Sequence, residues 1–342
     1  MYTPFSRINH QNNIINICYH DNNGGLNHDA MVISSILEST GFTIYQNGER
    51  QHYHKFFKLK DKYLQFIIPL FDLNKNDHNI LLTIHLESIL ECNINTTGKN
   101  ILIPNLEWLR KESYDLLSEM DLFICKTYSA KRFFDSQALP AVYTSFSSIS
   151  PYNVQYEQKP NTFIHIAGNS HYKGTLNLVK LWSEHPEWPE LKVIVRNAAH
   201  LKKFNANNLN IINKFLTKDK LSQLQNESEI HLCPSEAEGF GHYICEPLSC
   251  GSIVITTDGY PMNELVQPNR GFLIKTIDHE PLRCSRRFTF DPSHLEHIIE
   301  ATLRLSKNEK SKLKTNAKHW FNNNHKKFQT SFVAAIKRCI AI

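Results

Sequence analysis

Short apolar runs alternate with amphipathic segments along most of the chain. In the first half, the apolar runs predict strands at 14–19, 42–45, 64–68, 80–86, 101–103 and 122–125. Between them, apolar residues at helical spacing predict a helix over 29–39 that ends before Gly41, and a second helix is expected over 107–118. This alternation is typical of a parallel sheet whose two faces are covered by helices.

The same alternation begins again after a loop at 144–160, which is rich in Ser, Pro and Tyr and has little periodicity. Strands are expected at 162–167, 192–195, 210–212, 230–232 and 253–256, and helices at 176–185, 218–226 and 242–250. The tail, 292–342, predicts basic helix interrupted by a polar segment at 321–325. We therefore predict an α/β fold of two doubly wound domains that bind ligands in the cleft between them, past the carboxyl ends of the strands.

Size and composition agree with two ordinary globular domains. The chain has 342 residues, more than a single hydrophobic core usually supports. An apolar fraction of 41% with only 14 Pro and 12 Gly argues against intrinsic disorder and collagen-like repeats. The apolar windows at 63–71 and 80–84 are shorter than the roughly 20 residues that cross a bilayer, and 1–13 is too polar for a secretory signal. We expect a soluble, cytoplasmic protein.

Neither cysteine nor histidine is spaced for metal binding. The eight Cys include no C-x-x-C pair, and the 18 His include no H-x-x-x-H or H-E-x-x-H motif. The formal net charge of +5 suits a small anionic ligand better than nucleic acid. We therefore expect no metal site and no nucleic-acid partner.

The most informative stretch contains two carboxylates eight residues apart, Glu238 and Glu246, with Gly239, Phe240 and Gly241 between them. The glycines allow backbone amides to approach a ligand closely, and the helix expected at 242–250 points its positive end at the same place. Glu246, further along that helix, can accept two hydrogen bonds from a diol such as a ribose. The plain alternative is a loop and helix start with two solvated acids.

This segment resembles the E-x7-E signature of retaining glycosyltransferases with two Rossmann-like lobes, the GT-B architecture of the glycogen-synthase-like, family 4-like group. The likeness extends to Asn23-Gly24-Gly25, which resembles the family's glycine loop, and to Lys173-Gly174, which resembles its donor-phosphate lysine. Asn263-Glu264 resembles the acidic end of the loop after E-x7-E. The match covers about 160–275, whereas the first lobe matches only in its order of elements and its glycine loop.

The resemblance implies a division of the chain into three parts. Residues 1–155 would form the acceptor-binding Rossmann-like domain, and 156–324 the nucleotide-sugar-binding one. Residues 325–342 would form a helix that returns to the first domain, where Phe328, Phe332 and Ile336 are expected to pack.

The resemblance also implies roles for the residues of the signature. Glu238 would contact the hydroxyls of the transferred sugar and stabilise positive charge at its anomeric carbon, so it is a catalytic candidate. The amides of Gly239, Phe240 and Gly241 would hold that sugar, and Glu246 would bind the nucleotide ribose.

The donor diphosphate would lie between the two lobes. Lys173 would neutralise its growing charge as it leaves. Gly24 and Gly25 would lie against the same phosphates, and Glu264 counts among the donor-binding residues. Lysine and amide dipoles would do the work of a divalent ion, so no metal or other cofactor is expected.

One departure from the family concerns phosphate binding. Relatives usually carry an Arg several residues before the lysine, and here Gly168 is followed by Asn169 and Ser170 instead. Either these two residues hold the phosphate with neutral hydrogen bonds, or Arg196 at the end of the next strand supplies the charge. The alternative for Arg196 is a solvated residue at a strand end.

Two features of the first lobe have two interpretations. His85 ends a strand, and some relatives use a His from this lobe to contact the transferred sugar, so it is a catalytic candidate; a merely exposed imidazole is the alternative. Asn105 is expected to cap a helix that starts at Glu107, with Trp108 packed inward. The alternative for this turn is a contact with the acceptor.

We therefore expect a retaining, metal-independent hexosyltransferase that moves a hexose-type sugar from a UDP- or GDP-sugar to an unidentified glycan, lipid or protein acceptor. A catalytically inactive nucleotide-sugar-binding relative is one alternative, because the Arg is missing. Another enzyme of the same fold, such as an epimerase, is a second. The basic tail is also able to make weak contact with an anionic membrane surface, although its dispersed charges favour a solvated face.

Overall fold

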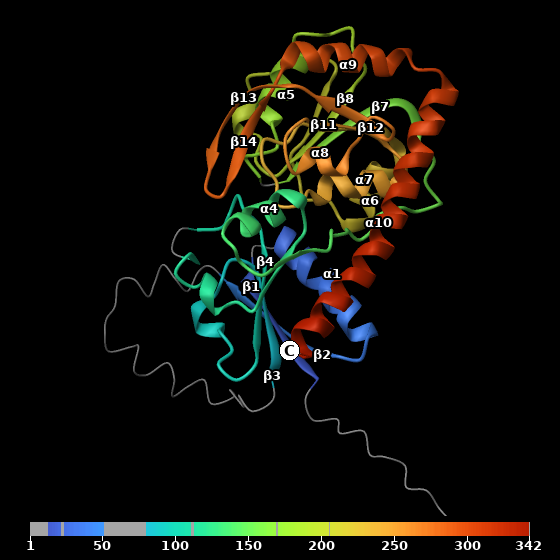
Figure 1. Ribbon diagram of the computed structural model, residues 1–342. Helices are drawn as coiled ribbons and strands as arrows, with labels where there is room; N and C mark the ends of the chain where they lie inside the picture. The colour runs from blue at the N-terminus through green and yellow to red at the C-terminus, as the bar shows by residue number, and fades with distance from the viewer. Residues whose placement is uncertain are drawn as a thin grey trace, which may run out of the picture.

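The computed structural model describes residues 13–21, 24–50, 80–110, 113–168, 170–204 and 206–341. These residues form two lobes, each built on a parallel sheet, with one long C-terminal helix running along both (Figure 1). The predicted strand at 64–68 lies outside the described residues.

The N-terminal lobe contains a six-stranded sheet in the order β2-β1-β3-β4-β5-β6 within the described part of the chain. Its strands are β1 (Ile14–Asp21), β2 (Thr43–Arg50), β3 (Ile80–Glu87), β4 (Lys99–Pro104), β5 (Leu122–Cys125) and β6 (Ala141–Tyr143). Its helices are α1 (Gly25–Ser39) and α4 (Tyr128–Ser136), with 3-10 turns η2 (Glu91–Asn93) and η4 (Leu117–Glu119). All neighbouring strands are parallel, and the strand order reverses between β1 and β3.

The C-terminal lobe repeats the architecture with a different strand order, β12-β11-β10-β7-β8-β9. Its strands are β7 (Lys159–Gly168), β8 (Leu191–Val195), β9 (Leu209–Ile212), β10 (Ser228–Cys233), β11 (Ile253–Thr257) and β12 (Gly271–Ile274). Its helices are α5 (Thr175–Ser183), α6 (Lys218–Glu227), α7 (His242–Cys250), α8 (Met262–Leu265) and α9 (Pro292–Arg304), with the 3-10 turn η5 (Ala199–Leu201). The order reverses between β7 and β10, and all pairs are parallel.

These strand orders define where ligands bind. In doubly wound sheets the ligand crevice lies outside the carboxyl ends of the strands, at the point where the order reverses. The loops after β1, β3, β7 and β10 occupy those points. The two predicted doubly wound domains are therefore confirmed.

An antiparallel hairpin of β13 (Thr276–Leu282) and β14 (Ser285–Phe290) follows the second sheet. The sequence pattern did not predict it, because most residues of β13 are exposed and no apolar face marks it as a strand. Backbone pairing along the hairpin stabilises it, together with the burial of Phe288 and Phe290 on β14.

The helix expected over 107–118 is absent from the described residues of that range. Backbone N–H groups of Trp108 and Leu109 donate to the Asn105 carbonyl in a single turn. The Asn105 side chain donates to Glu87 Oε2 at 2.9 Å instead of capping a helix. Trp108 is 39% exposed, so the prediction that it packs inward was wrong.

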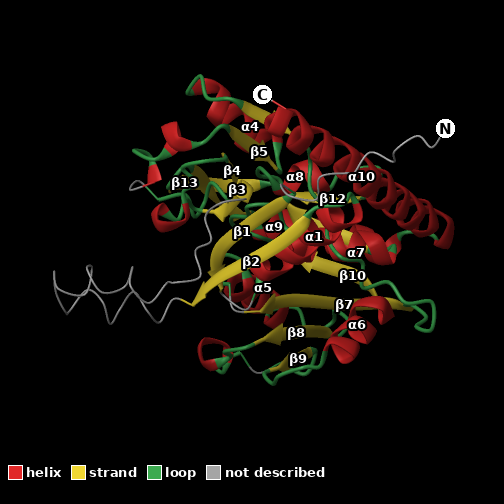
Figure 2. Cartoon of the chain, turned by 90° about the horizontal axis from the view of Figure 1, so that it is seen from below, coloured by secondary structure: helices red, strands yellow, loops and turns green. Residues whose placement is uncertain are grey.

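The tail forms two helices, α9 and α10 (Lys307–Ala341), which are separated at residues 305–306. α10 is continuous over 321–325, so the break predicted there does not exist, and the helix begins well before residue 325. Its polar residues bond to the loop between the lobes: Asn324 Nδ2 donates to the Phe146 carbonyl at 2.7 Å, and His325 Nδ1 lies 3.0 Å from Ser147 Oγ. The polar side chains of this segment therefore have hydrogen-bond partners within the protein, and the helix continues through it. Both views show α10 lying along the two lobes (Figures 1 and 2).

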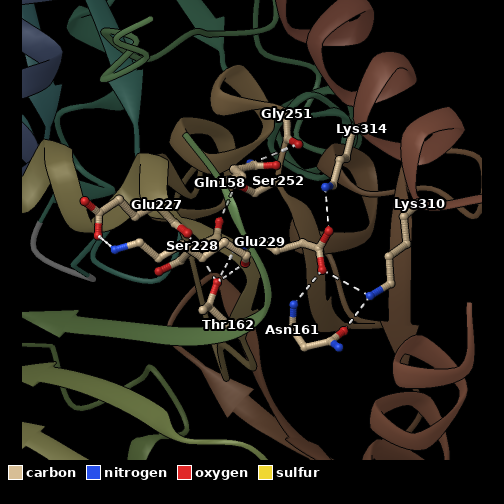
Figure 3. Close-up of polar contacts among 11 residues, drawn as sticks. Gln158, Asn161, Thr162, Glu227, Ser228, Glu229, Gly251, Ser252, Lys310 and Lys314 are labelled. Atoms are coloured by element: carbon tan, nitrogen blue, oxygen red, sulfur yellow. Dashed lines mark hydrogen bonds and ion pairs between the residues drawn. The ribbon is translucent and has the colours of Figure 1, made fainter. Parts of the chain in front are cut away.

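The two ends of α10 attach to different lobes. Near its start, the buried Glu229 carboxylate accepts from Lys310 at 3.0 Å, from Lys314 at 2.5 Å and from the Asn161 amide at 2.9 Å (Figure 3). Towards its end, Phe328, Phe332 and Ile336 are fully buried in a core that includes residues of β1 and β3, which confirms their predicted packing. No helix in the described part of the chain is long and apolar enough to span a membrane.

Candidate active site

The loops at the carboxyl ends of the two sheets touch each other. A Cβ atom on Gly239, in the loop after β10, would lie 2.3 Å from Asn105 Oδ1 and 2.8 Å from Glu107 Oε1 of the N-terminal lobe. No side chain fits there, so only glycine allows this approach. The carboxylate segment of the sequence therefore lies at the junction of the lobes, as predicted.

Glu238 and Lys173, the two predicted catalytic residues of the C-terminal lobe, form an ion pair. Their side chains are 10% and 14% exposed. Ser235 Oγ also donates to Glu238, and the Lys173 ammonium lies 3.9 Å from the centre of the Tyr243 ring. The pair is thus held in a mostly dry setting, where charges interact more strongly than in water.

Backbone contacts place Lys173 beside the Glu238 loop. Gly174 has φ +66°, and a Cβ on it would lie 2.2 Å from the Pro234 carbonyl oxygen. The Glu236 amide donates to the Tyr172 carbonyl at 2.8 Å. The loops after β7 and β10 are therefore joined on both sides of the lysine.

Phe240 and Gly241 complete this loop and start α7. Gly241 has φ +105° and is the N-cap of the helix. Phe240 is 3% exposed and packs edge-on against Phe146, with ring centres 5.4 Å apart. The buried ring fixes the loop, so the positive end of α7 faces the same junction as Lys173.

Glu246 lies on α7 and faces α1 of the other lobe. Its Oε2 accepts from Gln225 Nε2 at 2.7 Å, and its Oε1 lies 3.8 Å from His28 Nδ1. Burial raises the pKa of Glu246. At the start of α1, Gly24 caps the helix, and a Cβ on Gly25 would meet nothing within 4 Å. Gly25 therefore borders open space at the start of α1.

A buried ion cluster at the junction was missed by the sequence interpretation. Asp29 on α1 accepts from Lys126 at 2.9 Å and lies 2.7 Å from His242 Nε2, at the start of α7. Burial alone would raise the pKa of Asp29, but Lys126 and His242 lower it to about 2. His28 stacks on His242 with ring centres 4.4 Å apart, and burial lowers its pKa to about 4. The partners of Asp29 are 97 and 213 residues away, so no local pattern marks them.

Glu264 also bridges the lobes. It accepts from the backbone amides of Tyr128 at 2.7 Å and Ser129 at 2.9 Å, at the first turn of α4. A carboxylate at a helix N-terminus satisfies otherwise unpaired N–H groups and is favoured by the helix dipole. Its predicted contact with the donor stays a prediction.

The family model described as "Glycosyl transferases group 1" matches residues 128–320, more than half of the chain. The chain belongs to this glycosyltransferase family. No curated protein matches its sequence significantly.

Solved structures resemble this glycosyltransferase over nearly its whole length. Sucrose-phosphate synthase from Thermosynechococcus elongatus has a TM-score of 0.72 at 11% identity, over 96% of this chain and 99% of that one. Anabaena HepE, solved with UDP and glucose, has a TM-score of 0.70 at 12% identity, over 95% and 99%. An α,α-trehalose 6-phosphate synthase from Burkholderia multivorans has 0.68 at 10%, over 97% and 98%. These likenesses show the GT-B fold.

The remaining predicted site residues lie at different depths in the glycosyltransferase. His85 is fully buried inside the N-terminal sheet, where its Nδ1 accepts from the Leu90 amide at 3.2 Å and burial lowers its pKa to about 4. It is therefore neither on the surface of the junction nor an exposed strand end, and its catalytic role stays a prediction. Arg196 is exposed and lies beside the end of β7, where its backbone N–H donates to the Gly168 carbonyl at 3.1 Å. Asn169 lies outside the described residues.

The β13–β14 hairpin of the glycosyltransferase reaches the other lobe. Arg283 Nη1 donates to the Trp108 carbonyl at 2.8 Å, and its guanidinium lies 4.8 Å from the centre of the Trp108 ring. Arg287 Nε pairs at 2.6 Å with Glu236, which lies two residues before Glu238 in the chain. The hairpin therefore links the loop that contains Glu238 to the turn after β4.

Within the residues that the structure describes, no three His, Cys, Asp or Glu side chains gather in a way that could hold a metal ion. The positive groups at the junction include Lys173, Lys126, Arg283, Arg287 and the starts of α1, α4 and α7.

Proposed function

We propose that this glycosyltransferase moves a hexose from a nucleotide diphosphate sugar to a hydroxyl-bearing acceptor, with retention of configuration and without a metal. The observation that carries the proposal is the Lys173–Glu238 pair at the strand-order reversal of the C-terminal sheet, beside the start of α7. Residues 1–155 would supply the acceptor side and 156–324 the donor side. UDP-sugars are the first donors to test, because two structural neighbours, HepE and the pneumococcal O-GlcNAc transferase GtfA, were solved with UDP.

The donor diphosphate would lie between the starts of α7 and α1, where both helix dipoles favour negative charge. Lys173 would then exchange Glu238 for a phosphate oxygen. This exchange frees the Glu238 carboxylate to face the anomeric carbon, while Glu246 binds the ribose diol in place of Gln225. Arg196 and the amides of Gly239–Gly241 would complete the donor site.

In the transfer step, the bond between the anomeric carbon and the diphosphate oxygen breaks, and the bond to the acceptor oxygen forms on the same face. The acceptor proton passes to the leaving diphosphate, so no separate base is required. Lys173 contributes most in the transition state, since negative charge grows on the diphosphate as the bond breaks. Glu238 offsets the positive charge that develops on the sugar.

The test combines donor binding with donor hydrolysis. A panel of nucleotide sugars is screened by thermal shift, and UDP or GDP release is followed for each compound that stabilises the protein. We expect a shift and slow release for one donor, with release lost in Glu238→Gln. Lys173→Met should slow release by a larger factor than it weakens donor binding, whereas Lys180→Met, an exposed lysine on α5, should behave like the wild type.

Other outcomes favour the alternatives. Stabilisation without release, even with broad acceptor mixtures, would favour a nucleotide-sugar-binding protein without turnover, which the missing Arg motivates. No stabilisation by any nucleotide sugar would remove the donor site from the proposal. Action in the cytoplasm and weak contact of α10 with anionic membranes stay predictions.

A further inference from the structure

The wall of the N-terminal lobe that meets Glu238 and Gly239 is made of uncharged and acidic side chains. Asn105 and Glu107 follow β4, and Glu87 ends β3. Asn105 is 8% exposed and Glu107 is 5% exposed. Both lie against Gly239, next in the chain to the carboxylate proposed to face the donor sugar.

Two oxygen atoms in this wall have no hydrogen-bond partner among the described residues: Asn105 Oδ1 and Glu107 Oε2. The Asn105 amide nitrogen is satisfied, because it donates to Glu87 Oε2 at 2.9 Å. Buried polar atoms are nearly always paired, and an unpaired one is costly. Two such atoms in one short turn at the junction indicate partners that arrive with a ligand.

The charges around these atoms define what that ligand can be. Glu87, Glu107 and Glu238 place three carboxyl groups in the area, and the cations near them already have partners: Lys173 pairs with Glu238, Lys126 with Asp29, and Arg283 donates to the Trp108 carbonyl. Burial, together with Glu87, raises the pKa of Glu107 to about 8, with Lys126 opposing and Glu238 adding to the shift. At neutral pH the carboxyl is protonated, so it can both donate and accept a hydrogen bond.

We propose that Asn105 and Glu107 form the acceptor subsite and bind a hydroxyl group of an uncharged, sugar-like acceptor, not of a phosphorylated one. A ligand hydroxyl can donate to Asn105 Oδ1 and accept from the protonated Glu107 carboxyl. One ligand group then gives a hydrogen-bond partner to both side chains. A phosphate would instead meet the carboxyl groups of Glu87 and Glu238, and the lysines near them, Lys126 and Lys173, are already paired. This inference rests on the proposed function, since it places the acceptor beside the sugar that Glu238 would contact.

Gly239 lies against Asn105 Oδ1 and against Glu107 Oε1, the other oxygen of that carboxyl, so the closed junction covers this wall. An acceptor therefore reaches the wall when the lobes move apart, and the lack of a side chain at Gly239 lets the junction close again. The chain passes between the lobes in the 144–158 loop and in α10. We therefore expect the junction to open by a rotation of one lobe against the other.

The experiment compares transfer with hydrolysis. The purified full chain, with its preferred donor, is given a panel of neutral mono- and disaccharides and the matching sugar phosphates, and the ratio of transfer to donor hydrolysis is measured for each. The wild type should transfer to a neutral sugar and not to its phosphate. Asn105→Ala and Glu107→Leu should lower that ratio about tenfold, the equivalent of one hydrogen bond.

Two controls separate acceptor binding from a structural role. Glu107→Gln keeps a neutral donor and acceptor at the same place, so it should retain most of the transfer. Asn177→Ala, an exposed residue of α5, should keep the wild-type ratio.

The outcomes are distinguishable from a failure of the proposed function. If donor hydrolysis falls as much as transfer does in both Asn105→Ala and Glu107→Leu, the turn supports the donor site. That result would overturn the inference. Equal transfer to sugar phosphates would overturn the acceptor class. If the wild type neither binds nor hydrolyses any nucleotide sugar, the proposed function fails, and this inference fails with it.

Discussion

At the scale of single residues, the donor side of the site depends on side chains with more than one partner. Lys173 contacts both the Glu238 carboxylate and the Tyr243 ring, and Glu246 faces both Gln225 and His28. Each of these groups is already oriented by the protein, so a ligand that replaces one partner meets a prepared geometry.

Replacing Glu246 by Ala should weaken donor binding by roughly 1–3 kcal/mol, the usual contribution of a hydrogen bond to a charged group. The affinity for UDP, measured by titration calorimetry, checks this prediction. Glu184→Ala, an exposed residue after α5, is the matched control. Unchanged affinity in Glu246→Ala would remove the ribose contact from the proposed site.

Replacing Gly239 by Ala should hold the lobes apart, because the new Cβ would lie 2.3 Å from Asn105 Oδ1. We expect a larger radius of gyration in small-angle scattering and strongly reduced transfer. Gly25→Ala should keep the compact shape, because its Cβ meets nothing within 4 Å. A Gly239→Ala variant as compact as the wild type would show that the loop yields instead of the lobes.

At the scale of whole elements, the junction is built by helix starts. The first turn of α4 receives the Glu264 carboxylate from the other lobe, and the first residue of α7, His242, reaches Asp29 on α1. Unpaired N–H groups at a helix start are strong donors, so contacts of this kind join elements from different lobes at defined orientations.

Glu264→Gln tests whether this residue serves the fold or the donor. A neutral side chain loses the interaction with the α4 dipole, so we expect the free energy of unfolding to fall by about 0.5–2 kcal/mol in urea denaturation. Thr127→Val, which removes the cap of α4 within its own lobe, provides a comparison. Lower UDP affinity with unchanged stability would instead support the predicted donor contact.

At the scale of the whole molecule, pH acts through buried titratable groups. His85, His165 and His231 are at most 2% exposed, and burial lowers the pKa of each to about 4. The folded protein keeps them neutral, whereas the unfolded chain takes up protons below about pH 6.5. Acidification from pH 6.5 to 4 therefore favours unfolding, by up to about 1.4 kcal/mol per pH unit for each histidine.

Glu107 acts in the opposite direction. Its pKa is raised to about 8, so its neutral form is stabilised and its contribution to stability decreases as pH rises from about 4.5 to 8. We expect the free energy of unfolding to be largest near pH 6.5, as measured by urea denaturation at pH 5, 6.5 and 8. Glu107→Gln should flatten the alkaline side and His231→Gln the acid side. A profile that is flat from pH 5 to 6.5 would contradict the assignment.

The alternating strands and helices, the two doubly wound lobes and the segment around Glu238 and Glu246 could all be predicted from the sequence. These features are local, because a buried strand or an amphipathic helix shows its burial in a few consecutive residues. Family resemblance added Lys173 and the glycine loop on the same local grounds.

The contacts between residues far apart in the chain depend on the three-dimensional fold. The cluster of Asp29, Lys126 and His242, the cap that Glu264 gives to α4, and the complete burial of His85 all depend on strand order and on the packing of one lobe against the other. The continuity of α10 has the same origin, since its polar residues bond to the loop between the lobes rather than to water. The burial of a side chain shows in the local pattern of apolar residues. Its contact with a distant residue shows in no local pattern, because strand order and the packing of the lobes bring the two residues together.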